Sequence, residues 1–218
     1  EARGIRAGAG RDRGGGWHLP GRRAEAMTGP VSPTGPPTTA GHSVLVVPIP
    51  ALETLVAARH AHYDRDYVSA DPTFAHAHVT ILGPWLTQAD LADPVRANAA
   101  LTAVRDIASA TRGFDIDFAH VDTFPNGIIH LVPEPAEPFA ALTAAVYREF
   151  PAYPPYAGQF GVVQPHLTLD AVGAGVTEAV VREWVADRLP LRVRADRLHL
   201  SWYEAGRCQT LAVFPFGR

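Results

Sequence analysis

Apolar and polar residues follow two different periods along this chain of 218 residues. Short runs with a period of two predict strands, and apolar residues recurring every three or four positions predict helices. Strands are predicted at 43–49, 76–85, 114–124, 128–133, 165–172, 191–203 and 207–216. Helices are predicted at 51–67, 88–110, 138–150 and 177–189. Asn126-Gly127 joins two of these strands as a hairpin turn, which favours an α+β fold with antiparallel sheet.

The first 41 residues show neither period. Residues 28–41 are rich in Pro, Gly and Thr, so 1–41 is predicted to be a disordered tail or linker, followed by one domain at 42–218. Met27 is the only Met, and one hypothesis is that the natural protein starts there. An Arg-rich arm that binds RNA is the alternative reading of residues 1–26.

Composition places the protein outside membranes. No run approaches the roughly 18 apolar residues that a membrane-spanning helix needs, and the chain does not begin with an apolar signal-peptide core. We therefore expect a cytoplasmic protein.

Cys208 is the only cysteine, so an internal disulfide and a Cys-rich zinc site are excluded. No oligomerisation signal is evident, and a monomer is expected.

The types and numbers of charged residues exclude several classes of function. Lysine is absent, and all 19 basic residues are Arg. This excludes ligases that use a Lys nucleophile, and phosphate loops that depend on Lys. Six Arg and three acidic residues lie in 1–26, which leaves 13 Arg against 19 acidic residues and a net charge of −6 in 27–218. Its net negative charge makes the segment 27–218 poorly suited to non-specific nucleic-acid binding. A nucleotide substrate should therefore be a small molecule or the end of a nucleic-acid chain.

Two predicted strands carry the same short pattern of His, aliphatic, Thr and aliphatic residues. The first copy is His78–Ile81 and the second is His166–Leu169. Because side chains alternate between the faces of a strand, each copy presents its His and its Thr on one face, roughly 7 Å apart. If the two strands face each other, two imidazoles and two hydroxyls converge on one cleft.

This set of side chains suits phosphodiester chemistry. One His can take a proton from the attacking group while the other gives a proton to the leaving oxygen, and Thr hydroxyls can donate to the phosphate. A single copy of the pattern is more often structural than catalytic, but two copies in strand context favour catalysis. Zinc binding by His76 with His78, or by His60 with His62, is the rival reading. Other strand histidines are interpreted as ordinary strand residues: His120, His130 and His199.

The doubled pattern resembles the paired signature of the 2H phosphoesterase superfamily, in particular its bacterial 2′-5′ RNA ligase-like branch. The likeness runs from Ser43 to Phe216 and includes Gly83-Pro84-Trp85, the hairpin at 122–133, the helix at 138–150, and Pro165. The resemblance implies a bilobal α+β fold, with an antiparallel sheet in each of two pseudo-symmetric lobes and the active cleft between them. It also implies a cyclic phosphodiesterase that opens 2′,3′-cyclic phosphates, commonly to a 2′-phosphate, without metal or cofactor.

By the same resemblance, His78 is the general acid, His166 is the general base, and Thr80 and Thr168 hold the phosphate. The opposite assignment of acid and base stays open. Reversible 2′-5′ joining needs only the same pair acting in reverse, and hydrolysis is expected to dominate in water.

Two aromatic residues are candidates for stacking on a nucleobase: Tyr156 and Trp202. Packing in a loop or in the core is the alternative reading of both. Two other functions also stay open: the same fold acting on another small cyclic nucleotide, and a non-catalytic module that binds a nucleotide or RNA.

Overall fold

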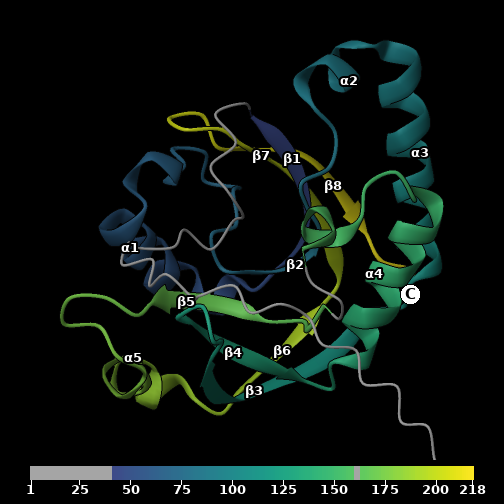
Figure 1. The fold of residues 1–218 in the computed structure, drawn as a ribbon. Coiled ribbons are helices and arrows are strands. Elements are labelled where there is room, and N and C mark those ends of the chain that lie inside the picture. The colour runs from purple at the N-terminus through teal and green to yellow at the C-terminus, as the bar shows by residue number, and fades with distance from the viewer. Residues whose placement is uncertain (1–40, 160–162) are drawn as a thin grey trace, which may run out of the picture.

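The computed structural model describes residues 41–159 and 163–218 (Figure 1). Within them, eight strands form one sheet in the order β6-β3-β4-β5-β2-β1-β7-β8, and all neighbours are antiparallel. The strands are β1 (His42–Pro48), β2 (His78–Leu82), β3 (Phe114–Thr123), β4 (Ile128–Glu134), β5 (Leu167–Ala171), β6 (Leu191–Ala195), β7 (Arg197–Tyr203) and β8 (Gln209–Pro215). The predicted antiparallel α+β class is confirmed.

The sheet consists of two four-stranded halves that meet at β2 and β5. Neighbouring strands within each half pair over four to six positions. Between β2 and β5, by contrast, the register contains only Val79 opposite Leu167. The two lobes predicted from the resemblance are thus the halves β6-β3-β4-β5 and β2-β1-β7-β8 of one continuous sheet.

Helices cover both sides of this sheet, with α1 and α5 on one side in Figure 1 and α3 and α4 on the other. Helix α1 packs against β5, α4 against β2, α3 against β8 and α5 against β3. The α-helices are α1 (Glu53–Tyr63), α2 (Gln88–Ala92), α3 (Pro94–Ala110), α4 (Glu137–Glu149) and α5 (Glu178–Val185). Short 3-10 helices are η1 (Pro50–Leu52), η2 (Arg65–Tyr67), η3 (Pro155–Gly158) and η4 (Ala186–Arg188).

One predicted helix is divided into two α-helices, and one predicted strand is divided into two strands. The helix expected at 88–110 is two helices, because the Asp93 carboxylate caps α3 by accepting from the N–H groups of Val95 and Arg96, and Pro94 begins the new helix. The strand expected at 191–203 is β6 and β7, which lie in different halves of the sheet. The break is at Asp196, whose carbonyl accepts from Phe216 N–H instead of a strand neighbour.

No helix in the described ranges is long and apolar enough to cross a membrane. The predictions for 1–41, including the start at Met27, fall on residues outside the described ranges except for Gly41. Cys208 is buried and has no disulfide partner among the described residues, as its solitary position in the sequence requires.

Candidate active site

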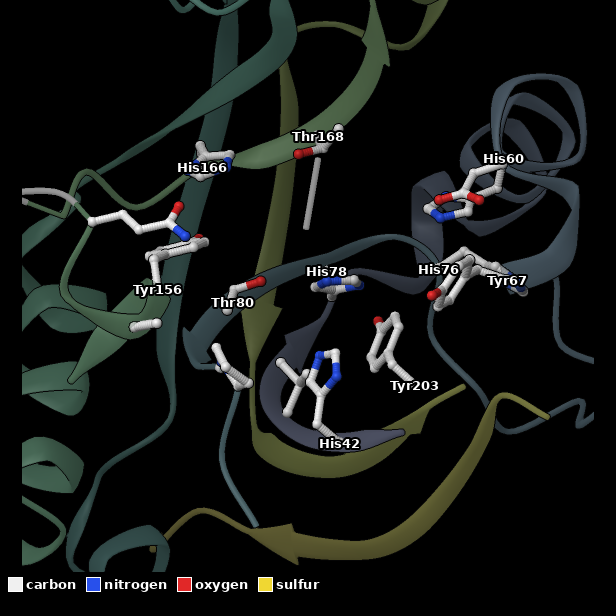
Figure 2. Close-up of a pocket in the computed structure, with 16 residues that line it drawn as sticks. His42, His60, Tyr67, His76, His78, Thr80, Tyr156, His166, Thr168 and Tyr203 are labelled. Carbon is white, nitrogen blue, oxygen red and sulfur yellow. The ribbon is translucent and has the colours of Figure 1, made fainter. Parts of the chain in front are cut away.

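The seam between the two halves of the sheet determines which way the two His-Thr motifs face. Val79 and Leu167, the pair in register there, are both fully buried and belong to the main core. The neighbours of each on its own strand therefore point to the opposite face. That face carries a pocket lined by the His and Thr of both motifs (Figure 2).

The register at the seam also determines how these four side chains are arranged. Because the strands are antiparallel and Val79 lies opposite Leu167, His78 falls opposite Thr168 and Thr80 falls opposite His166. Each imidazole thus faces a hydroxyl across the seam, and the two histidines lie on a diagonal, with backbones about 7–8 Å apart. A tetrahedral group of the size of phosphate fits between side chains placed in this way.

Both histidines are held in the same tautomer. Nδ1 of His78 lies 2.8 Å from the Ala75 carbonyl oxygen, and Nδ1 of His166 lies 2.8 Å from the Gln164 carbonyl oxygen. Since a carbonyl can only accept, the proton of each neutral ring is on Nδ1. Nε2 of each ring is then the nitrogen available to accept a proton from, or return one to, a molecule in the pocket.

Burial keeps both rings neutral near pH 7. Desolvation lowers the pKa of His166 to about 4, although the hydrogen bond to Gln164 opposes it, and the rings of His130 and His78 lower it further. Desolvation likewise lowers the pKa of His78, against the hydrogen bond to Ala75 and the charge of Glu53. A bound phosphate would raise both pKa values, because a negative charge nearby favours the imidazolium form.

Tyr156 connects the two motifs. Its ring stacks on the His166 ring, with centroids 6.3 Å apart and an interplanar angle of 19°, and its hydroxyl is hydrogen-bonded to Thr80. Burial raises the pKa of the Tyr156 hydroxyl to about 12, with Thr80 opposing, so this group stays protonated. Its backbone N–H donates to the Gly83 carbonyl, and the backbone has a φ of 52°, a strained value for a residue other than Gly.

The sequence prediction for Trp202 needs correction. Its side chain is only 2% exposed, does not line the pocket, and donates from Nε1 to the Glu204 carboxylate. The next residue, Tyr203, points to the other face of β7 and lines the pocket, with its ring centroid 6.2 Å from that of His78. The aromatic residue that β7 brings to the pocket is therefore Tyr203, which sequence reasoning missed because the register of β7 was unknown.

His130 was also not recognised as part of the site. It lies opposite Thr168 on β4, is fully buried, and stacks on Phe124 with centroids 3.8 Å apart. Its ring meets the His166 ring edge to face at 5.4 Å. His130 and Phe124 thus form the wall behind His166 and contribute to its desolvation.

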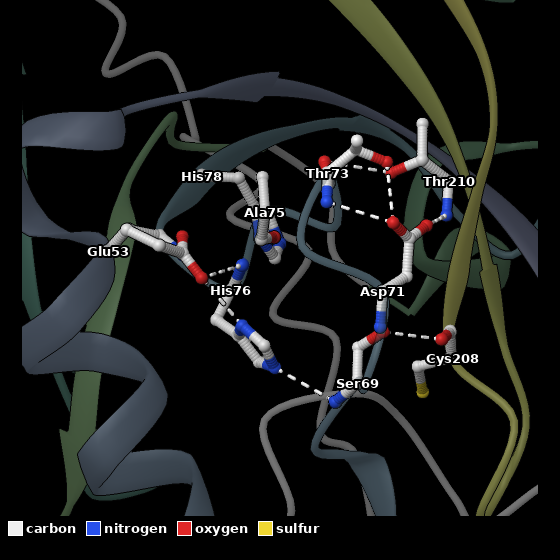
Figure 3. Close-up of polar contacts among 10 residues, drawn as sticks. Glu53, Ser69, Asp71, Thr73, Ala75, His76, His78, Cys208 and Thr210 are labelled. Carbon is white, nitrogen blue, oxygen red and sulfur yellow. Dashed lines mark hydrogen bonds and ion pairs between the residues drawn. The ribbon is translucent and has the colours of Figure 1, made fainter.

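His76 is engaged in holding the loop before the first motif (Figure 3). Its Nδ1–H donates to the Glu53 carboxylate over 2.6 Å, and its Nε2 accepts from the Ser69 N–H at 3.1 Å. Glu53 also accepts from the N–H groups of His76 and Ala77. Burial alone would raise the pKa of Glu53, but these hydrogen bonds outweigh burial and lower it.

These contacts position Ala75, whose carbonyl orients His78. On its other side the same loop is tied to β8, where Ser69 donates to the Cys208 carbonyl and Asp71 accepts from the N–H of Thr210. The zinc alternative with His76 and His78 would use His76 as a ligand, yet both of its ring nitrogens are occupied. Across 41–159 and 163–218, no group of three or more His, Cys, Asp or Glu is placed to hold a metal ion.

The chain is similar to solved structures at low sequence identity. TT0787 of Thermus thermophilus is 19% identical, with a TM-score of 0.52 over 81% of this chain and 98% of that chain. E. coli LigT complexed with 3′-AMP is 15% identical, with a TM-score of 0.48 over 82% of this chain and 99% of that chain. The likeness to TT0787 shows the fold alone.

Comparison at the level of sequence gives a more definite result. No curated protein matches the chain. The model of the 2′-5′ RNA ligase superfamily matches residues 47–207, which include both His-Thr motifs, the loop before the first and the strands that carry them. This match covers well over half of the chain and agrees with the resemblance drawn from the doubled motif. The chain belongs to the 2′-5′ RNA ligase superfamily.

Proposed function

We propose that the protein is a metal-independent cyclic phosphodiesterase that opens 2′,3′-cyclic phosphates of nucleotides or RNA ends. The observation that carries the proposal is the seam: two histidines in the same tautomer line one pocket, each opposite a Thr. Membership of the superfamily supports this chemistry. The acidic body of the chain favours a small substrate over long nucleic acid.

The reaction needs one base and one acid on opposite sides of the phosphorus. Nε2 of His166 takes a proton from water as the water oxygen attacks phosphorus, and the bond from phosphorus to the ribose O3′ breaks. His78, entering in its protonated form, gives the Nε2 proton to O3′, which leaves as a hydroxyl and yields a 2′-phosphate. The low pKa of His166 suits the base role, because the ring is deprotonated before substrate binds.

Thr80 and Thr168 donate hydrogen bonds to the non-bridging oxygens, where charge builds up in the transition state. The same residues acting in reverse would join a 5′-hydroxyl to a cyclic phosphate, and water at high concentration favours hydrolysis. We further propose that the protein acts in the cytoplasm as a monomer.

The test is turnover of 2′,3′-cyclic nucleotides in the presence of EDTA, with products resolved by phosphorus NMR. A 2′-phosphate is the expected product. If the wild type turns over no cyclic phosphate faster than the double variant His78→Ala, His166→Ala, the proposal is wrong. Tight nucleotide binding without turnover, unchanged in that variant, would instead favour a non-catalytic binding module.

The pH dependence of kcat/KM follows from the two depressed pKa values. This parameter reports the free enzyme, in which the base must be deprotonated and the acid protonated. Since the pKa of His166 is about 4 and that of His78 lies below its usual 6.5, we expect the maximum below pH 6.5. Above it, kcat/KM should fall about tenfold per pH unit as the acid loses its proton. Rates measured from pH 4 to 9 check this, and a plateau extending to pH 8 would contradict it.

A further inference from the structure

The pocket continues past His78 into a chamber between the end of α1 and the β1–β7 pair. Tyr67 and Tyr203 line this chamber, with His60 and His42 at its sides (Figure 2). Asp64 lines the same pocket. Tyr203 contacts the His78 ring edge to face, so the chamber opens directly onto the reacting centre. Whatever is attached to a phosphate held between the two histidines can extend into it.

The chamber has an unusual charge composition for a pocket expected to bind nucleotides. Among the described residues that line the pocket, Asp64 is the only acidic one, and none is an Arg. A carboxylate without an Arg among the described lining residues repels a second phosphate and favours a neutral group that donates hydrogen bonds. The chamber is thus suited to a nucleobase and unsuited to a further phosphate.

The Asp64 carboxylate lacks a hydrogen-bond donor among the described residues. Its backbone N–H caps α1 by donating to the His60 carbonyl at 2.8 Å. Over 41–159 and 163–218, however, no hydrogen bond or ion pair is made by its side chain. Burial raises the pKa of the Asp64 carboxyl, and the charge of Asp66 adds to this. A partly desolvated acceptor of this kind gains most from a donor brought by a ligand.

Two tyrosines provide flat walls next to this carboxylate. Tyr67 and Asp64 line the same pocket. Burial raises the pKa of the Tyr67 hydroxyl, and the charge of Asp64 raises it further. Tyr67 packs with Tyr203 and Phe74 in a small apolar cluster on the pocket side of β1. Aromatic faces bind a planar base without regard to its identity, so discrimination must come from a polar group at its edge.

We propose that Asp64 accepts a hydrogen bond from the exocyclic amino group of the substrate base, and so selects cytosine and adenine over uracil and hypoxanthine. The inference rests on the proposed cyclic phosphodiesterase function. An amino group donates to the carboxylate, whereas a carbonyl at the same position presents a second acceptor to it. A hydrogen bond to a charged group corresponds to a preference of about 10–100-fold.

The experiment compares two matched pairs of 2′,3′-cyclic phosphates, cytidine with uridine and adenosine with inosine. Members of each pair differ by an amino group in place of a carbonyl, and the adjacent ring nitrogen accepts a hydrogen bond in the amino member and donates one in the carbonyl member. For the wild type we expect kcat/KM to favour the amino member of a pair by about 10–100-fold. In Asp64→Asn the ratio should fall to about one or reverse, because the new amide can rotate to donate to a carbonyl.

Asp106→Asn is the matched control, because this carboxylate is exposed on α3, does not line the pocket and loses the same charge. Its ratios should equal those of the wild type. Ratios near one in both pairs for the wild type, or ratios unchanged in Asp64→Asn, overturn the inference and leave the phosphodiesterase intact. No turnover of any of the four compounds overturns both.

Discussion

Replacing His166 by Ala is expected to lower kcat/KM on a 2′,3′-cyclic nucleotide by about 10²–10⁴-fold, and replacing His78 by Ala should cost a similar factor. Each variant removes one of the two Nε2 atoms that face the pocket, and each proton transfer then has to use water. The double variant should be little worse than either single variant, because the two residues act as a unit.

His120→Ala is the matched control for these variants. This histidine is 69% exposed on β3, so the same substitution there should leave kcat/KM unchanged. Steady-state rates, with circular dichroism to establish that each variant is folded, make the comparison. A folded His166→Ala protein with more than a tenth of wild-type kcat/KM would contradict the role of His166 as the base.

Replacing Arg59 by Met is expected to have the largest effect on stability. Arg59 of α1 donates from Nε to Asp170, whose side chain is only 1% exposed and which follows the second motif on β5. The Arg59 guanidinium also lies over the Trp184 ring of α5, 4.2 Å from its centroid. Removing one partner of such a pair leaves a buried charge uncompensated, so the free energy of unfolding should fall by about 3–5 kcal/mol.

The exposed pair of Arg182 and Glu178 provides the control. Arg182 is 59% exposed, and Arg182→Met should lower the free energy of unfolding by no more than about 1 kcal/mol. Adding Asp170→Leu to Arg59→Met should restore part of the loss, since no unpaired carboxylate then remains buried. Urea unfolding of the four proteins measures these differences. Equal losses for Arg59→Met and Arg182→Met would show that the α1–β5 pair does not stabilise the fold.

Most elements of the fold were predictable from local pattern. The hairpin of β3 and β4, helix α4 and both motif strands lie close to their predicted positions. The division of 191–203 was missed, although the apolar positions change phase there, from Leu191 and Val193 to Leu198 and Leu200. A period-two pattern states which residues share a face, but a single change of phase does not reveal that the chain crosses to the other half of the sheet.

Within the site, the residues that depended on strand parity alone were placed as predicted, and those that depended on register were not. His78 shares a face with Thr80, and His166 with Thr168, because alternation along a strand is a local property, and all four side chains line the pocket. Trp202 was preferred over Tyr203 because nothing local distinguishes the buried face of β7 from the pocket face. Asp64 and His130 carried no motif, and they line the pocket or its wall only through contacts with segments distant in the chain.

The order of residues along the chain therefore decided which side chains each motif strand presents, since neighbours two positions apart must share a face whatever surrounds them. Tertiary structure alone decided that β2 and β5 lie side by side with Val79 opposite Leu167, which places each His across from a Thr. The tertiary structure also determines that Glu53 and His76 position the Ala75 carbonyl next to the His78 ring. These relations join residues tens of positions apart, and only the packing of the two half-sheets and their helices brings such residues within hydrogen-bonding distance.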